Sequence, residues 1–256
     1  MIHRPNVTDP GRVIAHRGAS RVAPENTLSA FRAAAAQGVW WVEFDVSLLG
    51  DGTPVVHHDG TLERCTGRRG PLTDIAAADL SDLSAGIRHG DQFRNGPLPT
   101  LEQVLDVLEE LHLYANLEMK PHDVPTGAIA AKVVEALATR PWARERIITS
   151  SFGHAELAAY RASAPNAPVA VLFEKPPRNW RVVVDQMQAA AVHLNFVHLS
   201  ESLLREASSF GIDTRVYTIN QPELMEPFRE HGLTSVITDH PPLFLELDDW
   251  ARWAKE

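Results

Sequence analysis

The stretch Trp40-Trp41-Val42-Glu43-Phe44-Asp45-Val46-Ser47 decides the fold prediction. It is apolar, aromatic and β-branched without a helical period, which predicts a buried strand. Residues two apart in a strand point to the same face, so Glu43 and Asp45 share one face and the apolar residues between them point to the other. Carboxylates held together in an apolar environment repel each other unless a cation lies between them. We therefore predict a divalent metal ion here; the alternative is an edge strand whose acids face water.

A second extended segment follows closely and reads Pro54-Val55-Val56-His57-His58-Asp59. His57 and His58 are neighbours on an extended chain, so at most one of them can point into a shared site. The alternation places His58 with Val56 and away from His57, and we select His58. Asp59 is predicted to be a turn residue or to support the histidine.

Upstream of these segments the chain follows a strand–helix–strand order. Residues 12–18 predict a first strand that opens into a loop, and Pro24-Glu25-Asn26-Thr27 predicts the start of a helix that Gly38 ends. The strand that carries Glu43 comes next, so the opening is the βαβ unit of a parallel sheet.

The same alternation resumes at Thr100, which is predicted to cap a helix. Eight strands are expected in all, each followed by a helix, centred near Val13, Val42, Leu117, Ile148, Val171, Leu194, Val216 and Ile237. That count and the length of 256 residues predict an α/β fold of the (β/α)₈ TIM barrel type, a single domain over 1–256. An open doubly wound sheet is the alternative, although no G-x-G-x-x-G turn follows the first strand.

Residues 60–99 interrupt the alternation after the second strand. We interpret them as a short insertion, too poor in large apolar residues for a core of its own. Cys65 lies in this insertion, and no nearby pattern marks it as a nucleophile.

Composition narrows the class of protein. A net charge of -9 argues against nucleic-acid binding, which relies on lysine and arginine. The single cysteine cannot form an internal disulfide. There is no signal-peptide pattern at the start and no run of about 20 apolar residues. We expect a cytoplasmic protein that acts on a small molecule, without integral membrane association; the oligomeric state stays open.

Polar residues collect where the predicted strands end, which is where barrel enzymes place their chemistry. His16 and Arg17 end the first strand, and Glu118 and Lys120 share one face of the third. Three carboxylates without a sulfur ligand suit a hard cation such as Mg²⁺ or Ca²⁺, and an arginine and a lysine beside it suit a phosphate group.

Each of these residues also has a purely structural interpretation. His16 alone could cap a strand end, and Glu118 could form an ion pair with Lys120 or Arg17. His193 and His198 are expected to be core or loop histidines. Asp239 is expected to cap the last helix. Tyr217 and Asn220 could line the mouth of the barrel, although Tyr217 is equally well explained as packing.

The ordered set of motifs resembles the glycerophosphodiester phosphodiesterase family. The motifs are His16-Arg17-Gly18, Pro24-Glu25-Asn26-Thr27, Glu43-x-Asp45-Val46, Val55-Val56-x-His58-Asp59, Pro99-Thr100-Leu101, Leu117-Glu118-x-Lys120 and Thr238-Asp239-x-Pro241. The resemblance implies a (β/α)₈ barrel that uses Mg²⁺ or Ca²⁺. It also implies hydrolysis of deacylated phospholipids, such as glycerophosphocholine or glycerophosphoethanolamine, to glycerol 3-phosphate and an alcohol.

The resemblance also implies roles for single residues. Glu43, Asp45 and Glu118 would hold the metal, His16 and His58 would be the acid–base pair, and Arg17 and Lys120 would contact the phosphate. The modest length of the insertion resembles the cytosolic bacterial type.

Two departures and two alternative functions accompany the resemblance. Leu49 stands where the family commonly has threonine, and Tyr217 replaces a common tryptophan, which leaves the shape of the alcohol pocket open. One alternative is a phospholipase D-like enzyme acting on lysophospholipids. The other is a barrel that binds a glycerophosphate without turnover.

Overall fold

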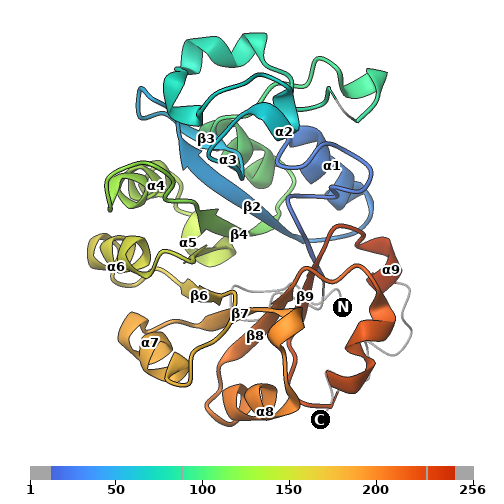
Figure 1. Cartoon of the computed structure of the whole chain (residues 1–256), viewed down its shortest axis with the longest axis vertical. Helices are drawn as coiled ribbons and strands as arrows, with labels where there is room; N and C mark the ends of the chain where they lie inside the picture. The colour runs from blue at the N-terminus through green and yellow to red at the C-terminus, as the bar shows by residue number, and fades with distance from the viewer. Residues whose placement is uncertain (1–12, 88, 229, 246–256) are drawn as a thin grey trace.

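Eight parallel strands close into a barrel in the computed structural model, which describes residues 13–87, 89–228 and 230–245 (Figure 1). The strands are β1 (Val13–Ala15), β2 (Trp41–Leu48), β4 (Tyr114–Met119), β5 (Ile147–Ser151), β6 (Val169–Phe173), β7 (Ala191–Asn195), β8 (Asp213–Tyr217) and β9 (Ser235–Thr238). Strand β1 pairs with both β2 and β9, which closes the barrel. The predicted (β/α)₈ barrel and all eight strand positions are confirmed, and the open sheet is excluded.

Helices cover the outside of the strands (Figure 1). They are α1 (Leu28–Ala36), α3 (Leu101–Glu110), α4 (Ala128–Ala138), α5 (Ala143–Arg146), α6 (His154–Ser163), α7 (Trp180–Met187), α8 (Glu201–Ser209) and α9 (Pro242–Leu245). The hydroxyls of Thr27 and Thr100 accept backbone N–H groups at the first turns of α1 and α3. None of the described helices is long and apolar enough to cross a bilayer.

The structure differs from the prediction, or covers only part of it, at three helices. Glu25 lies before α1 and not in its first turn, because the helix begins only after Thr27. The segment between β8 and β9 is a 3₁₀ helix, η5 (Pro222–Phe228), and not the predicted α-helix. Pro227 lies inside η5 and cannot donate the backbone hydrogen bond that an α-helix requires there. The last helix was predicted near Pro242–Trp253. The structure describes α9 (Pro242–Leu245), and the rest of the predicted range lies outside the described residues.

The two faces of β2 have opposite environments, as predicted from their alternation. Val42, Phe44 and Val46 pack in the apolar layer between the strands and the helices. Trp41 lies on the other face, in an apolar cluster with Ile14, Ile148, Ala170, Ala191 and Ile237 from neighbouring strands. Glu43 and Asp45 follow on this inner face toward the carboxyl end of the strand. The apolar cluster around Trp41 therefore fills the barrel interior beneath the acids.

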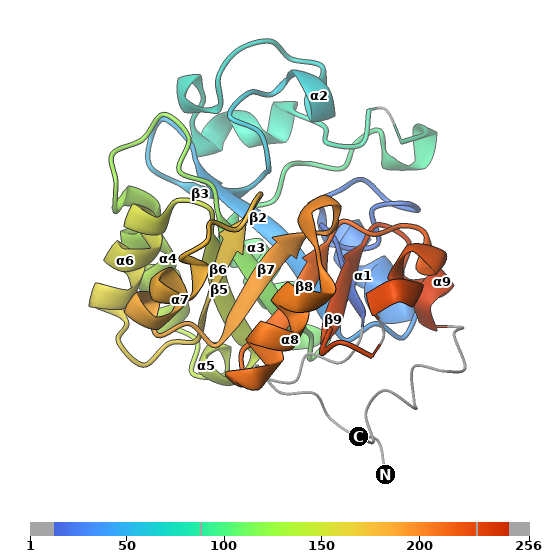
Figure 2. The same cartoon turned by 60° about the horizontal axis from the view of Figure 1, so that its bottom comes forward.

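The insertion stands at one end of the barrel (Figure 2). Strand β3 (Pro54–Val56), antiparallel to β2, leads into it. The insertion itself contains α2 (Glu63–Thr66), η1 (Leu72–Asp74), η2 (Ala77–Asp82) and η3 (Asp91–Phe93). The sequence predicted that the insertion is too poor in large apolar residues for a core of its own. It shares a buried apolar cluster with the β2–β3 connection, formed by Leu49, Val55, Leu62, Leu72, Ile75, Leu80, Leu83, Ala85 and Leu98.

Candidate active site

Three acidic side chains meet at the carboxyl end of neighbouring strands. Glu43 and Asp45 come from β2 and Glu118 from β4, and the strand register places Asp45 opposite Glu118. All three side chains are buried, and each offers one carboxylate oxygen within 4.8 Å of the other two. One ion could therefore contact all three residues.

The charges around the three acids are unequal. Asp45 lies 3.2 Å from Arg17 Nε and 3.3 Å from Lys120 Nζ. Burial alone would raise the pKa of Asp45, but these two cations outweigh it and lower that pKa. Burial and repulsion from neighbouring acids raise the pKa of Glu43 and of Glu118, although Lys120 Nζ also lies 2.5 Å from Glu118 Oε1. Burial therefore disfavours the charged forms of Glu43 and Glu118, and a further cation between the acids would oppose that effect.

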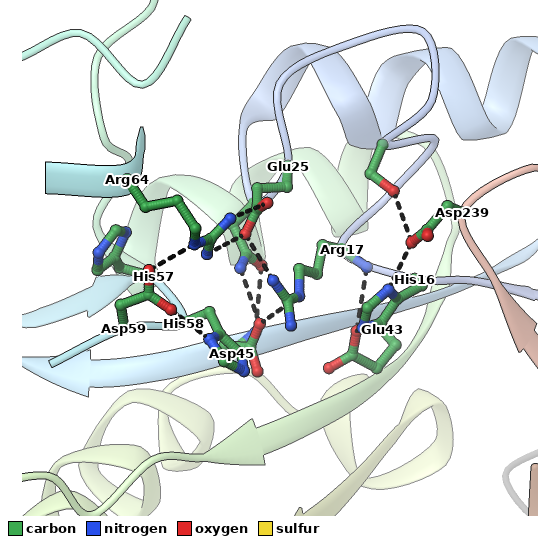
Figure 3. A network of polar contacts seen from close by, with 12 residues as sticks. His16, Arg17, Glu25, Glu43, Asp45, His57, His58, Asp59, Arg64 and Asp239 are labelled. Carbon is green, nitrogen blue, oxygen red and sulfur yellow. Dashed lines mark hydrogen bonds and ion pairs between the residues drawn. The ribbon is translucent and has the colours of Figure 1, made fainter. Parts of the chain in front are cut away.

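The loop after β1 orients two of the acids (Figure 3). The backbone N–H of Arg17 donates to Glu43 Oε2 at 3.0 Å. Asn26 donates from Nδ2 to Asp45 Oδ2 at 2.8 Å and accepts from the backbone N–H of Asp45 at 3.2 Å. Asn26 has φ +58°, a conformation that asparagine tolerates better than most residues. The sequence motif includes Asn26, but the prediction assigned it no role.

His16 is held by a carboxylate from the far end of the chain. Its Nδ1 lies 2.6 Å from Asp239 Oδ1, and its Nε2 lies 3.9 Å from Glu43 Oε2. Burial would raise the pKa of Asp239, but hydrogen bonds from His16, Asn220 and Ser20 lower it to about 2. An ionised carboxylate can only accept, so Nδ1 carries the proton and Nε2 faces the acids.

These contacts correct the prediction for Asp239. The hydrogen bonds of its carboxylate go to His16, Ser20 and Asn220, and not to the first turn of α9. Asn220 also accepts from the backbone N–H of Asp239 and from the hydroxyl of Thr238, so it positions the carboxylate. Asn220, which the sequence offered as a residue at the mouth of the barrel, therefore has the specific role of positioning Asp239.

His58 forms a second pair of the same kind. Its Nδ1 lies 2.6 Å from Asp59 Oδ1, so Asp59 supports the histidine as one prediction had it. Burial and the nearby cations lower the pKa of His58, against the opposing effect of Asp45 and Asp59. His57 is buried away from the cavity, with Nε2 2.9 Å from the backbone oxygen of Thr61. The structure thus places His58, and not His57, beside the acids.

Arg64 of the insertion links the carboxylate that supports His58 to the carboxylate that contacts Arg17 (Figure 3). Arg64 of α2 donates from Nε to Asp59 Oδ2 at 2.6 Å and from its terminal nitrogens to both oxygens of Glu25. Glu25 Oε1 also accepts from Arg17 at 2.7 Å. A continuous polar chain therefore joins His58 to Arg17. The sequence interpretation assigned no role to Arg64 or Glu25, because their contact spans 39 positions.

A cavity of about 400 Å³ opens beside these groups. One part of its wall contains the predicted residues His16, Arg17, Glu43, His58, Glu118 and Lys120. The other part contains residues that the sequence prediction did not use: Asn116, Phe152, Leu172, Glu174, Asn195, Phe196 and Val197. Asp45 is not part of the cavity wall. Tyr217 does line the cavity, as one interpretation of the sequence proposed.

Three other residues considered in the sequence, His193, His198 and Cys65, lie outside the group of acids and paired histidines. His193 is fully buried on β7, as expected for a core histidine, but it also borders the cavity. Burial lowers its pKa well below the usual value, so its imidazole is neutral. His198 lies in the short 3₁₀ helix η4 (Phe196–His198). Cys65 is buried, and burial raises the pKa of its thiol to about 11, which leaves it unreactive.

Known proteins resemble this chain over nearly its whole length. The model of the glycerophosphoryl diester phosphodiesterase family matches residues 16–243. A glycerophosphodiester phosphodiesterase of Caldanaerobacter subterraneus subsp. tengcongensis is 31% identical over 92% of this chain and 96% of its own.

Solved structures show the same relationship. A phosphodiesterase of Oleispira antarctica, solved with its product sn-glycerol-3-phosphate, has a TM-score of 0.87 and 31% identity over 91% of this chain and 95% of its own. A glycerophosphodiester phosphodiesterase of Thermotoga maritima has a TM-score of 0.75 and 27% identity over 96% of this chain and 100% of its own. The chain belongs to the glycerophosphoryl diester phosphodiesterase family of phosphodiester hydrolases.

Proposed function

We propose that this chain hydrolyses glycerophosphodiesters, such as glycerophosphocholine and glycerophosphoethanolamine, to glycerol 3-phosphate and an alcohol in a metal-dependent reaction. The observation that carries the proposal is the grouping in one place of three buried acids, two histidine–carboxylate pairs and two cationic side chains. The similarity to the Oleispira phosphodiesterase, whose structure contains sn-glycerol-3-phosphate, supports the choice of substrate class.

The acidic cluster suits a divalent cation. Glu43, Asp45 and Glu118 would supply oxygen ligands only, the type that Mg²⁺ and Ca²⁺ prefer. Burial and mutual repulsion raise the pKa of Glu43 and of Glu118, and a bound divalent cation would offset both effects, which supports a metal at this place. A bound divalent cation would neutralise charge on the phosphate oxygens as the phosphorus becomes more crowded.

The protein side chains would bind the phosphate and move protons. Arg17 and Lys120 line the cavity beside the acids and would attract the anionic diester. One of His16 and His58 would accept a proton from the attacking hydroxyl, and the other would donate a proton to the departing alkoxide. The attacking hydroxyl is that of water or the 2-hydroxyl of the substrate's own glycerol. Each imidazole is already oriented through Nδ1 by its carboxylate, which leaves Nε2 for the proton transfer.

Release of glycerol 3-phosphate tests the proposal. The purified protein is incubated with glycerophosphocholine or glycerophosphoethanolamine and with Mg²⁺ or Ca²⁺, then with a chelator, and then with the metal restored. We expect glycerol 3-phosphate to be released with the metal, the release to stop when the chelator is added, and the release to resume when the metal is restored. His16→Ala or His58→Ala should each lower turnover about 10²- to 10⁴-fold.

Metal binding is measured separately from turnover. Added Mg²⁺ or Ca²⁺ should raise the melting temperature of the wild type, and Glu118→Gln should reduce that shift. Parallel incubation with a lysophospholipid tests the phospholipase D-like alternative. A protein that releases no alcohol from any diester with any cation would contradict hydrolysis and support a binding barrel.

A further inference from the structure

The cavity wall formed by β6, β7 and β8 carries a set of residues to which the proposed reaction assigns no role. These strands are neighbours in the barrel, so the residues at their carboxyl ends lie side by side. Glu174 directly follows β6, Asn195 ends β7 and Tyr217 ends β8. All three line the same cavity as Glu43 and Glu118, two of the predicted metal ligands.

Glu174 is fixed in place by neutral partners. Asn195 donates from Nδ2 to Glu174 Oε1 at 2.7 Å. The amide of Asn195 is itself oriented, because its Oδ1 accepts the backbone N–H of Val197 at 3.0 Å. Tyr217, whose hydroxyl donates to the backbone oxygen of Phe173 at 2.9 Å, lies 3.5 Å from the second oxygen of Glu174. These contacts hold the carboxylate at the rim of the cavity, where the Glu174 side chain is exposed to solvent.

The polar partners of Glu174 leave its negative charge without an ion pair in the described part of the chain. Asp45, Asp59 and Glu25 each lie within ion-pair distance of an arginine or lysine. Across the described ranges, no lysine or arginine nitrogen forms such a pair with Glu174, whose polar partners are an amide and a phenol. A fixed, uncompensated carboxylate repels a phosphodiester anion, unless the substrate itself brings a positive charge to this place.

Aromatic side chains complete the same part of the wall. The rings of Phe152 and Tyr217 meet edge to face with centroids 5.9 Å apart, and Phe196 also lines the cavity. Phe152 is 39% exposed, and the Lys120 ammonium lies 5.5 Å from its ring centroid. Aromatic faces beside a carboxylate attract organic ammonium groups, and quaternary ammonium groups especially.

We propose that Glu174, with Phe152 and Tyr217, forms a subsite for a positively charged alcohol group of the substrate. The inference rests on the proposed function and deepens it: the preferred substrates carry choline or ethanolamine, and diesters with an uncharged alcohol are poorer substrates. Glu174 acts as a specificity residue and takes no part in the proton transfers.

Hydrolysis of three diesters tests the subsite. The ratio of kcat/KM for glycerophosphocholine or glycerophosphoethanolamine to kcat/KM for the uncharged-alcohol diester glycerophosphoglycerol is measured for the wild type and for Glu174→Gln. We expect this ratio to fall about 5-fold in the variant, the effect of removing one of two unit charges about 4 Å apart in water-like surroundings, because Glu174 is exposed. Glu206→Gln, on the exposed face of α8, removes the same charge away from the cavity and should keep the wild-type ratio.

Inhibition by the free alcohol provides a second measurement. Choline should inhibit the wild type more strongly than its uncharged carbon isostere, and Glu174→Gln should abolish that difference. Glu174→Asp, which keeps the charge, should retain part of it. Far-ultraviolet circular dichroism confirms that the variants fold.

The possible failures are distinguishable. If the wild type hydrolyses diesters but Glu174→Gln changes all three rates by the same factor, the subsite is wrong and the proposed function stands. If the wild type releases glycerol 3-phosphate from none of them, the proposed function itself fails.

Discussion

Replacing Asp239 with asparagine removes the charge that holds His16 and keeps nearly the same shape. In the wild type, the ionised carboxylate accepts from His16 Nδ1 at 2.6 Å. Asparagine is neutral and can turn its amide N–H toward Nδ1. The imidazole proton would then move to Nε2, the nitrogen that faces Glu43.

The expected magnitude follows from the kind of hydrogen bond that is lost. A hydrogen bond to a charged group is worth about 1.5–3 kcal/mol, and each 1.36 kcal/mol corresponds to about tenfold in rate. We therefore expect kcat for glycerophosphocholine to fall about 10- to 150-fold in Asp239→Asn. KM should change little, because Asp239 contacts the histidine and lies outside the wall of the main cavity.

Steady-state kinetics with saturating metal give both parameters. Ser20→Ala is the matched control, because Ser20 donates to the same carboxylate oxygen at 3.1 Å and its loss leaves the charge in place. That variant should lose about 5-fold or less in kcat, the worth of an ordinary hydrogen bond. An Asp239→Asn enzyme with the kcat of Ser20→Ala would refute the reasoning, because the charge on Asp239 would then have no role beyond anchoring.

Substitutions at three further positions test other parts of the structure. Arg64→Gln cuts the link between Asp59, which supports His58, and Glu25, which contacts Arg17, so kcat/KM should fall about 10-fold. Arg64→Lys should restore part of the lost kcat/KM. Equal kcat/KM in the wild type and both variants would contradict a positioning role for Arg64. His193→Gln tests a buried neutral imidazole. Because burial lowers the pKa of His193, only the unfolded chain takes up its proton below about pH 6.5, so wild-type stability is present above that pH and falls by up to about 1.4 kcal/mol per unit below it. Urea unfolding at two acidic pH values should show a smaller loss in the variant than in the wild type. Asn26→Asp places a further carboxylate against Asp45 and should lower the unfolding free energy by about 2 kcal/mol or more in the absence of metal, with part of the loss recovered when Ca²⁺ is added.

The parts of the fold that depend on local patterns were predictable from the sequence. Each barrel strand is a short apolar run between turn residues, so the eight strands were identified at the correct positions. Alternation along β2 and β4 correctly indicated which acids share a face. The hydroxyls at Thr27 and Thr100 marked the starts of α1 and α3, because capping is a local interaction.

The parts that depend on distant contacts were not predictable in the same way. The Asp239 carboxylate has helix-capping chemistry, and only the closure of the barrel determines that it faces His16. Arg64 lies in an irregular segment whose path no periodicity describes, and its two acidic partners come from separate loops. The apolar cluster that the insertion shares with Leu49 and Val55 was not predicted, because its residues are scattered along the sequence and meet only when the insertion folds onto the β2–β3 connection.

Closure of the barrel has a consequence for the order in which this protein acquires its chemistry. His16 is synthesised 223 positions before its carboxylate partner, which lies on the loop after β9. The three buried acids at positions 43, 45 and 118 also precede that loop. A nascent or truncated chain that ends before β9 therefore has the acids but an unsupported imidazole, and competence for hydrolysis should begin only once β9 and the loop after it have been synthesised.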